Sequence, residues 1–336
     1  MQTSPTRIGI VGCGGMARTH LVRMLEQPEK NQVVVVSEPS PEAYAALNPL
    51  FTKAGLPTPP NQPDLLRMLD EYSGKLDAVF IVTPHIFHYE QARQCLEAGL
   101  DVLLEKPMVM NSQEAIDLIA ARDRTKRHLV VAFNGSLSPR IRAASALLRS
   151  GEIGDIQSIA ATVWQNWGSQ THGLWRQVPA IAGGGFMFDT GAHMLNTVCD
   201  LAGEDFVEVA AWLDNKSRPV DIIGVVMGRL ASGAFVTLHA CGETIRTWSS
   251  DVKVFCSGAI IRTDVWGKFL EIQREGEPDF TPIEFADLPS VWDQFLSMRA
   301  GEIPNSSPPE VGLRMAKLWD AIQESARQNG RSVSIK

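Results

Sequence analysis

A glycine-rich turn near the amino end of the chain constrains the fold more than any other feature. The segment IGIVGCGGMARTHL, residues 8–21, begins as an apolar strand and ends as a helical pattern. Its G-x-G-x-x-A motif places Gly12 for a tight turn, Gly14 for close approach of a pyrophosphate, and Ala17 for close packing of helix on strand. The amino end of the helix offers free N–H groups to the same phosphates. The motif predicts a Rossmann dinucleotide-binding fold, and an ordinary turn without ligand is the alternative. The predicted cofactor contacts of the turn are Gly12, Gly14, Gly15, Met16 and Ala17.

An acidic residue follows the second predicted strand. The run VVVVS at 33–37 ends at Glu38, near the spacing of about 20 residues from the glycine turn that is expected of a ribose-binding acid. A carboxylate there accepts hydrogen bonds from a 2′-hydroxyl and repels a 2′-phosphate. Because residues 37–40 contain no lysine or arginine, we expect NAD as the cofactor in preference to NADP. A solvated glutamate in a loop is the alternative interpretation.

Length and hydrophobic rhythm predict two domains, at residues 1–135 and 136–336. In the first, β-branched runs alternate with helical patterns, which is typical of an α/β Rossmann domain whose parallel sheet has helices on both faces. Its predicted strands are 8–11, 33–37, 78–82, 101–104 and 129–132, and its predicted helices are 16–26, 42–54, 63–72, 89–98 and 112–125. In the second, a helix near 139–149 precedes longer alternating strands at 156–164, 206–213, 222–227 and 234–239. That half is predicted to be an α+β domain with a large, mostly antiparallel open sheet and a final helix at about 311–327.

Composition argues against several classes of function. The net charge of −7 comes without a basic patch suited to nucleic acid, and no apolar run is long enough to cross a bilayer. We interpret the basic run at 122–127 as the solvated end of a helix. The first residues lack the charged and apolar regions of a secretory signal, which predicts a cytoplasmic protein. The five cysteines form no CxxC pair, so we expect reduced thiols and no metal site.

Two loops follow the third and fourth predicted strands, at carboxyl ends where ligands of open α/β sheets bind. The first loop holds Thr83 and Pro84, with His85 and His88 close behind, and the second holds Glu105, Lys106 and Pro107. Proline at 107 favours extended geometry at Lys106, with a cis bond as one form of it, and this would hold the amine over the cofactor end of the cleft. A plain proline-marked loop is the alternative for each.

Three consecutive glycines, 183–185, precede a third candidate group in the segment AGGGFMFDTGAHMLN. Glycines in a row are expected where the backbone bends beside a ligand. On the helix that follows, Asp189, His193 and Asn196 are expected to form one polar stripe, because they stand at positions i, i+4 and i+7. A structural histidine is commoner than a catalytic one, but the whole stripe favours chemistry.

A tryptophan-rich segment, WQNWGSQTHGLWRQ at 164–177, precedes those glycines. Flat indole faces beside amide, imidazole and guanidinium groups suit a polyhydroxylated ring, so we expect a sugar or cyclitol substrate. Tryptophans packed into a core are the alternative. The indoles are Trp164, Trp167 and Trp175, and the polar neighbours are Asn166, His172 and Arg176.

Taken together, these motifs resemble those of the glucose-fructose oxidoreductase/inositol dehydrogenase (Gfo/Idh/MocA) family, through nearly the whole chain. The FN pair at 133–134, the SGEIG turn at 150–154 and the LWDAIQESAR helix add to the resemblance. It implies an NAD(P)-dependent oxidoreductase with Lys106, Asp189 and His193 at the catalytic positions. The remaining predicted cofactor contacts are Thr83, Pro84, His88, Glu105, Lys106 and Asn134, and the predicted substrate contacts are Lys106, Trp167, Trp175, Arg176, Asp189 and His193.

Two departures from the family pattern bear on the substrate. Many members have an aspartate at the position of Asn196, and many have a basic residue where this chain has Gly135-Ser136. We interpret the first as the loss of a carboxylate partner of the substrate or of His193. The second is interpreted as the loss of a positive group at the mouth of the cleft.

The chemistry requires a base within reach of the reacting hydroxyl. Oxidation of an alcohol by hydride transfer needs the hydroxyl proton to leave, and either Lys106 or His193 can accept it. The same groups would donate a proton to a carbonyl in the reverse reaction. A redox-neutral enzyme that cleaves glycosides with bound NAD and a non-catalytic NAD-binding regulator are the alternatives. We also expect a homodimer or homotetramer, since the second sheet would otherwise leave one face uncovered.

Overall fold

The computed structural model describes residues 4–285 and 289–335. The chain folds into two compact units. The first comprises Met1–Val109, Gln113–Ala132 and Pro289–Pro309, and the second comprises Met110–Ser112, Phe133–Leu288 and Glu310–Lys336. Among the described residues, no helix combines the length and the apolar character needed to cross a membrane.

The first unit is built on a five-stranded parallel sheet with the order β2-β1-β3-β4-β5. The strands are β1 (Thr6–Val11), β2 (Asn31–Ser37), β3 (Ala78–Ile81), β4 (Asp101–Leu104) and β5 (Leu129–Val131). Every residue of β3, β4 and β5 is buried, and except for Asp101 at the start of β4 all of them are apolar, as expected for strands covered on both faces. The predicted α/β Rossmann fold is confirmed.

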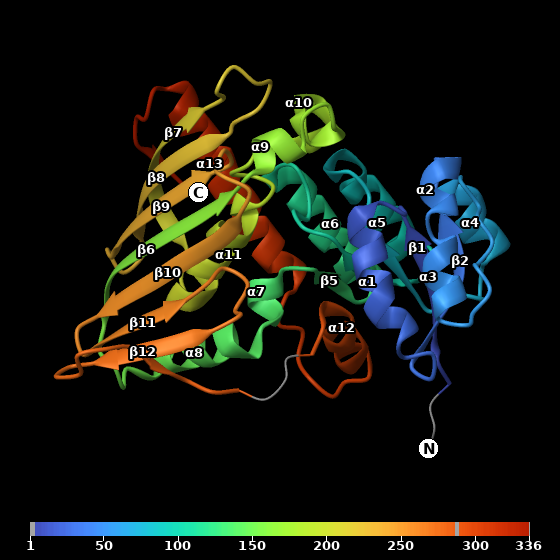
Figure 1. Cartoon of the computed structure of the whole chain (residues 1–336), viewed down its shortest axis with the longest axis horizontal. Helices are drawn as coiled ribbons and strands as arrows, with labels where there is room; N and C mark the ends of the chain where they lie inside the picture. Colours follow the sequence, from blue (N-terminus) through green and yellow to red (C-terminus); the bar gives the residue numbers. More distant parts are fainter. Residues whose placement is uncertain (1–3, 286–288, 336) are drawn as a thin grey trace. The chain divides into compact units, whose positions relative to one another are not determined.

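Helices connect these parallel strands (Figure 1). They are α1 (Gly15–Leu25), α2 (Pro41–Ala45), α3 (Asn48–Lys53), α4 (Leu65–Glu71), α5 (His88–Glu97) and α6 (Ser112–Thr125), with a 3-10 turn at His85–Phe87. The single helix predicted over 42–54 is wrong, because the segment forms two short helices. The second has Pro49 in its first turn, where the missing N–H costs no hydrogen bond.

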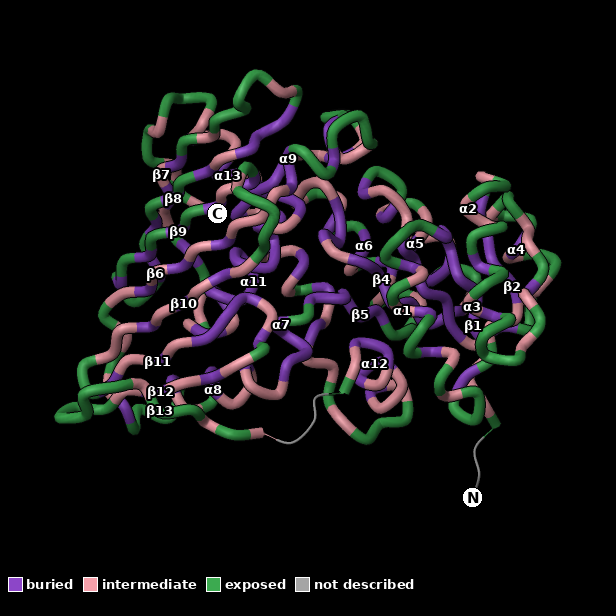
Figure 2. Tube along the Cα trace, viewed as in Figure 1, coloured by how far each residue is buried: buried purple, intermediate pink, exposed green. Residues whose placement is uncertain are grey.

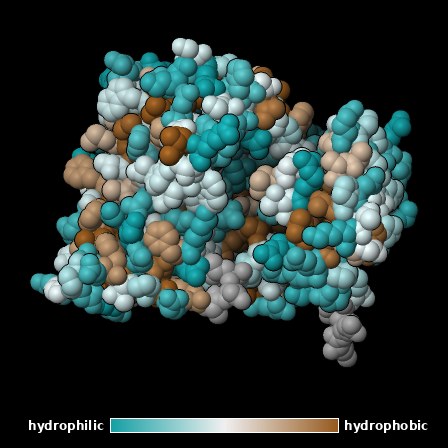
Figure 3. Space-filling model, viewed as in Figure 1, coloured by the Kyte–Doolittle hydropathy of each residue, from teal (hydrophilic) through white to brown (hydrophobic). Residues whose placement is uncertain are grey.

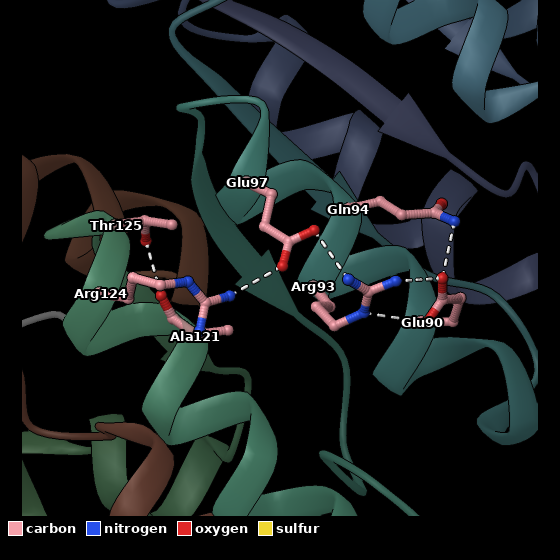
Figure 4. A network of polar contacts seen from close by, with 7 residues as sticks. All are labelled: Glu90, Arg93, Gln94, Glu97, Ala121, Arg124 and Thr125. Atoms are coloured by element: carbon pink, nitrogen blue, oxygen red, sulfur yellow. Dashed lines mark hydrogen bonds and ion pairs between the residues drawn. The ribbon is translucent and has the colours of Figure 1, made fainter.

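The basic run at the end of α6 is a solvated helix end, as predicted. Arg124 of α6 pairs with Glu97 of α5 at 2.8 Å, and Glu97 also pairs with Arg93 at 2.7 Å (Figure 4). Arg93 contacts Glu90 one turn earlier on α5. Because these ion pairs are exposed, each contributes little to the free energy of unfolding. Their structural effect is to link α5 and α6.

A segment from late in the sequence completes the first unit. It carries α12 (Val291–Arg299), which begins with a reciprocal cap between Ser290 and Asp293. Arg299 donates to the buried carboxylate of Asp101 at the start of β4, at 2.7 Å. Farther along, the N–H of Val131 in β5 donates to the carbonyl of Ser307 at 2.9 Å. The segment therefore covers the β5 edge of the sheet, whose backbone groups would otherwise lack partners.

The second unit contains a nine-stranded sheet with the order β13-β12-β11-β10-β6-β9-β8-β7-β14. The pair β6·β9 is parallel and the other pairs are antiparallel, so the predicted mostly antiparallel α+β half is confirmed. The strands are β6 (Ile156–Gln165), β7 (Phe206–Asp214), β8 (Ile223–Leu230), β9 (Phe235–Cys241), β10 (Trp248–Cys256), β11 (Ala259–Thr263), β12 (Leu270–Arg274), β13 (Thr281–Pro282) and β14 (Val333–Ser334).

One face of this sheet is covered and the other is open. Helices α8 (Pro139–Ser150), α11 (Gly191–Ala202) and α13 (Pro309–Arg327) lie behind the strands in Figure 1. Burial alternates along β8 and β9, which places every second side chain in the solvent (Figure 2). The open face nevertheless carries the large apolar side chains of Val225, Met227 and Phe235. In Figure 3, hydrophobic residues accordingly lie among hydrophilic ones over this sheet.

Candidate active site

The glycine turn has two kinds of glycine. Gly12 adopts a φ of +90°, and a Cβ there would lie 2.7 Å from the carbonyl oxygen of Val82, so the fold itself requires glycine. Gly14 and Gly15 differ, because a Cβ at either would meet no protein atom within 4 Å. Gly14 caps α1 with no side-chain hydrogen bond, so the first N–H groups of this helix remain available. The fold leaves open space at the motif position where a pyrophosphate would approach.

Glu38 is held against this turn by both of its carboxylate oxygens. Oε2 accepts the N–H of Cys13 at 2.7 Å and Oε1 accepts the N–H of Ser40 at 2.8 Å. Burial and the Glu38 carboxylate raise the pKa of the Cys13 thiol to about 12, so the thiol stays protonated. Asn61 holds the backbone of Glu38 from the other side, through hydrogen bonds to its N–H and its carbonyl. Glu38 is thus a fixed carboxylate and not a solvated loop residue.

The loops after β3 and β4 are joined by His88. Its Nδ1 lies 2.8 Å from the carbonyl oxygen of Pro107, and its Nε2 lies 2.9 Å from that of Thr83. Burial lowers the pKa of His88, although these carbonyls act in the opposite direction. Because the side chain is completely buried, His88 cannot provide the cofactor contact predicted for it. It positions the two loops instead, and one of them carries the predicted cis bond, between Lys106 and Pro107.

Glu105 of the second loop contacts α1. Its Oε1 lies 2.7 Å from Nε2 of His20, and Oε2 accepts the N–H of Lys106 at 3.1 Å. The imidazole of His20 also packs edge-on against Phe80 of β3. A residue of the loop that carries Lys106 is therefore fixed to the same helix whose amino end opens at Gly14.

In the second unit, Asp189 is the centre of a buried polar cluster. Its Oδ2 accepts the indole N–H of Trp167 at 2.8 Å and the Nε–H of Arg176 at 3.1 Å. The guanidinium of Arg176 in turn lies over the ring of Trp175, 4.5 Å from its centroid. Trp167 is only 2% exposed, so its role is to hold Asp189 and not to present a broad face to a ligand.

The predicted single helical stripe is wrong in one member. Helix α11 begins at Gly191, so Asp189 lies in the turn before it, while His193 and Asn196 are on the helix. The physical cause is the backbone turn before the helix, in which the N–H of Asp189 donates to the carbonyl of Gly185 at 2.9 Å and the N–H of Gly191 to that of Phe186 at 2.8 Å. The glycines that precede Asp189 are packed closely. A Cβ at Gly185 would overlap the backbone of Asp221, and one at Gly184 would press on Phe188. Glycine is therefore required at 184 and 185 because other residues of the protein approach the backbone closely. The prediction that these glycines bend the backbone beside a ligand is not needed to explain them.

Asp221 fixes that turn. Its carboxylate accepts the N–H of Gly185 at 2.7 Å and the N–H of Met187 at 2.9 Å, and its carbonyl accepts the N–H of Phe186. Burial raises the pKa of Asp221, while these N–H groups oppose the shift. The turn that presents Asp189 therefore depends on a carboxylate that the sequence analysis did not identify.

His193 lies among aromatic rings. Its ring centroid is 6.1 Å from that of Phe133 and 6.0 Å from that of Trp266, in the turn between β11 and β12. Beyond it, Trp248 meets Trp266 edge-on at 5.2 Å, and the ammonium of Lys268 lies 3.4 Å from the centre of the Trp248 ring. Trp266, Trp248 and Lys268 were missed because they are far from any motif in the sequence.

The two departures from the family pattern meet in one buried network. The side-chain amide of Asn196 donates to Ser136 Oγ at 2.7 Å and to Asp200 at 3.1 Å, and Ser136 Oγ donates to Asp200 at 2.5 Å. Arg314 closes the network through contacts with Asp200 and Asn196. Since Asn196 and Ser136 are 1% and 3% exposed, neither side chain faces a substrate in this chain. Both donate to Asp200 instead, and the interpretation of the two departures as lost ligand groups stays a prediction.

Within each unit, the structure brings several predicted residues together. The glycine turn and Glu38 form one group in the first unit, and Thr83 and Glu105-Lys106-Pro107 form another around His88. In the second unit, Trp167, Arg176 and Asp189 are in direct contact, whereas Asn134 is an exposed residue at the start of α7 (Asn134–Leu137). No cluster of histidine, cysteine and acidic side chains in residues 4–285 and 289–335 could hold a metal ion.

Comparison with known proteins matches both halves of the chain to one family. Residues 6–133 match a family described as an oxidoreductase family with an NAD-binding Rossmann fold, and residues 141–262 match the GFO/IDH/MocA C-terminal domain. The chain is 27% identical to a dTDP-3,4-didehydro-2,6-dideoxy-alpha-D-glucose 3-reductase of Actinomadura kijaniata over 96% of both chains. It is also 27% identical to a levoglucosan dehydrogenase of Pseudarthrobacter phenanthrenivorans, over 66% of this chain and 59% of that one. A solved structure of levoglucosan dehydrogenase in complex with NADH has the same fold, with a TM-score of 0.86, 21% identity, and coverage of 99% of this chain and all of the other.

Proposed function

This chain belongs to the Gfo/Idh/MocA family of NAD-binding oxidoreductases, and we propose that it transfers hydride between NAD and a hydroxyl or carbonyl carbon of a sugar or cyclitol. The observation that carries this proposal is the glycine turn of the first unit. Gly14 and Gly15 leave open space at the free amino end of α1, while Glu38 is fixed beside them. Relatives named for sugar and inositol dehydrogenation support the substrate class.

The residues present fit the cofactor. In the proposal, Gly12 to Ala17 bind the pyrophosphate, and the remaining lone pairs of Glu38 accept hydrogen bonds from a ribose hydroxyl. A bound NAD supplies the acceptor or donor of the hydride. The negative charge of Glu38 excludes a 2′-phosphate, which favours NAD over NADP. Thr83, Pro84 and the Glu105-Lys106 loop complete the set of proposed contacts, with Asn134 of the second unit.

Proton transfer is assigned to Lys106 and His193. When the substrate is oxidised, one of them accepts the hydroxyl proton, and the other donates a hydrogen bond to the reacting oxygen. Asp189 is the orienting acid, because its Oδ2 is already occupied by Trp167 and Arg176. A carboxylate with two donors on one oxygen is a poor base and a good anchor. Trp175 and Arg176 are proposed to contact the substrate from the same cluster.

The test is a spectrophotometric screen of sugars, inositols and sugar acids with NAD and NADP. We expect net NADH formation with at least one polyol and its loss in Lys106→Ala. The pH profile of His193→Ala then assigns the base, since the kinetic pKa belongs to whichever group remains. Release of an aglycone without net NADH would refute the dehydrogenase in favour of the redox-neutral alternative. NAD binding without turnover of any substrate would refute the enzyme and support the non-catalytic NAD-binding regulator.

We also propose a homodimer or homotetramer formed through the open face of the nine-stranded sheet. The face carries Val225, Met227 and Phe235 in exposed positions, and Trp212 of β7 adds a fourth large apolar side chain. Light scattering should give a mass of two or four chains, and Met227→Lys should lower it. A monomer at micromolar concentration would contradict this assignment.

We further propose that the protein is cytoplasmic. All five cysteines are free thiols, and a reducing compartment keeps thiols in that state. Fractionation of the native cells should recover the NAD-dependent activity with the cytoplasmic enzymes. Recovery with secreted proteins would refute it.

A further inference from the structure

A surface pocket of the second unit is separated from His193 and Asp189 by the side chains of Trp266 and Trp167. It has a volume of about 360 Å³ and is lined by Asn166, Ser169, Gln170, Arg246, Thr247 and Trp248. One wall is the short helix α9 (Trp167–Gln170) and the other is the entry to β10. The N–H of Asn166 donates to the carbonyl of Thr247 at 3.2 Å, which joins the two walls. Its volume is within the usual range for small-molecule sites.

The pocket connects with the second unit's proposed catalytic residues by two routes. The first is the series of ring contacts from His193 to Trp266 and from Trp266 to Trp248, which lines the pocket. The second is α9, whose Trp167 donates to Asp189 while its Ser169 and Gln170 line the pocket. A ligand in the pocket therefore sits next to the groups that hold Asp189 and His193.

The lining combines an apolar ring with polar side chains that have no protein partner. Trp248 is 54% exposed, although exposure of an indole to water is unfavourable. Among the described residues, the side chains of Asn166, Ser169 and Arg246 make no hydrogen bond or ion pair with one another or with any other residue. The ammonium of Lys268 covers one face of the Trp248 ring and is not part of the pocket lining. The pocket thus presents the remaining indole surface with several donors around it, a combination that matches the apolar face and peripheral hydroxyls of a pyranose ring.

We propose that this pocket is a subsite for a second sugar ring, so that the substrate is a glycoside of at least two rings and not a free monosaccharide. The reacting ring would occupy the site of His193 and Asp189, and the second ring would stack on Trp248 and take hydrogen bonds from Arg246 and Asn166. This inference rests on the proposed function for the position of the reacting ring. An apolar ligand would leave these donors unpaired, and a small anion would not use the indole.

Calorimetric titration of the NADH-bound protein tests the subsite without turnover. The probes are the disaccharides cellobiose, maltose and trehalose, with glucose as the single-ring comparison. At least one disaccharide should bind wild type tenfold more tightly than glucose. Trp248→Ala should raise the Kd for that disaccharide about tenfold, or about 1.4 kcal/mol in binding free energy. It should change the Kd for glucose less than twofold. Trp248→Phe should restore most of the affinity, because it restores a flat ring.

The control is Ile245→Ala. Ile245 is 82% exposed and lies in the loop between β9 and β10, next to Arg246, but does not line the pocket. The control variant should bind all probes like wild type. The subsite is refuted if no disaccharide binds better than glucose, or if Trp248→Ala weakens glucose and disaccharide equally. Disaccharide binding that depends on Trp248, without NADH formation in the screen, would refute the proposed function alone. NADH formation in the screen, together with a disaccharide Kd that is the same in Trp248→Ala as in wild type, would refute the subsite alone.

Discussion

Gly14→Ala should separate cofactor binding from folding. Gly14 has φ −64° and ψ −174°, a conformation that alanine adopts without strain, and its Cβ would contact no protein atom within 4 Å. The protein without cofactor should therefore lose no stability. A gain of about 0.4–1 kcal/mol is expected from the smaller entropy of the unfolded chain.

Binding of NAD should respond in the opposite direction. If the open space at Gly14 receives the pyrophosphate, the new methyl group meets a phosphate oxygen in the complex. Overpacking by one methyl costs about 1–3 kcal/mol. The Kd for NAD should then rise by about 5- to 150-fold.

Urea unfolding and calorimetric titration with NAD measure the two effects. Gly12→Ala is the matched control, because Gly12 combines a φ of +90° with a near clash against Val82. That variant should lose about 2 kcal/mol or more of stability by itself. Wild-type NAD affinity in Gly14→Ala, or a stability loss equal to that of Gly12→Ala, would refute the assignment of this space to the cofactor.

Three further changes test the contacts described above. Glu38→Gln should raise the Kd for NAD about tenfold and narrow the preference over NADP, because a charged acceptor becomes a neutral one; an unchanged preference in calorimetric titrations would contradict the ribose assignment. Arg299→Ala should lower the free energy of unfolding by about 2 kcal/mol, since it leaves the carboxylate of Asp101 buried without its cation; a urea midpoint equal to wild type would show that the pair is dispensable. The raised pKa of Asp221 means that the native state binds this proton more strongly than the unfolded state. Its stabilising contribution is therefore full below the unfolded pKa of about 3.9 and is lost as the pH rises through the folded pKa. Asp221→Asn should remove this pH dependence of the melting temperature, and parallel pH profiles for the two proteins would argue against it.

Local pattern was enough to predict the five parallel strands of the first unit and four of the nine strands of the second, whereas β10 to β14 and α12 were missed. The glycine turn, the continuous apolar runs of β3 and β4, and the alternation along β8 each depend on neighbours in sequence. The split between α2 and α3 was missed because hydrophobic periodicity continues across Leu47, where the structure interrupts the helix. A proline at the second position of α3 was the available signal.

The candidate site was less predictable because its supporting contacts are long-range. Asn61 and His20 hold Glu38 and Glu105 through contacts 23 and 85 residues apart in sequence. Asp221 reaches Gly185 across 36 residues. A single sequence carries no pattern that links such pairs. Motif residues could thus be identified, but not the residues that hold them in place.

The late segment Pro289–Pro309 has a consequence for synthesis of the chain. The ribosome completes residue 132 well before it reaches this segment, with strands β6 to β13 of the second unit made in between. At about 5–20 residues per second, the delay is roughly ten to thirty seconds. During that interval the carboxylate of Asp101 lacks its ion pair with Arg299, and the N–H of Val131 in β5 lacks its hydrogen bond to Ser307. The β5 edge of the nascent nucleotide-binding half is therefore uncovered during this interval. A gene fragment that stops near residue 135 would produce a protein in which this edge is never covered.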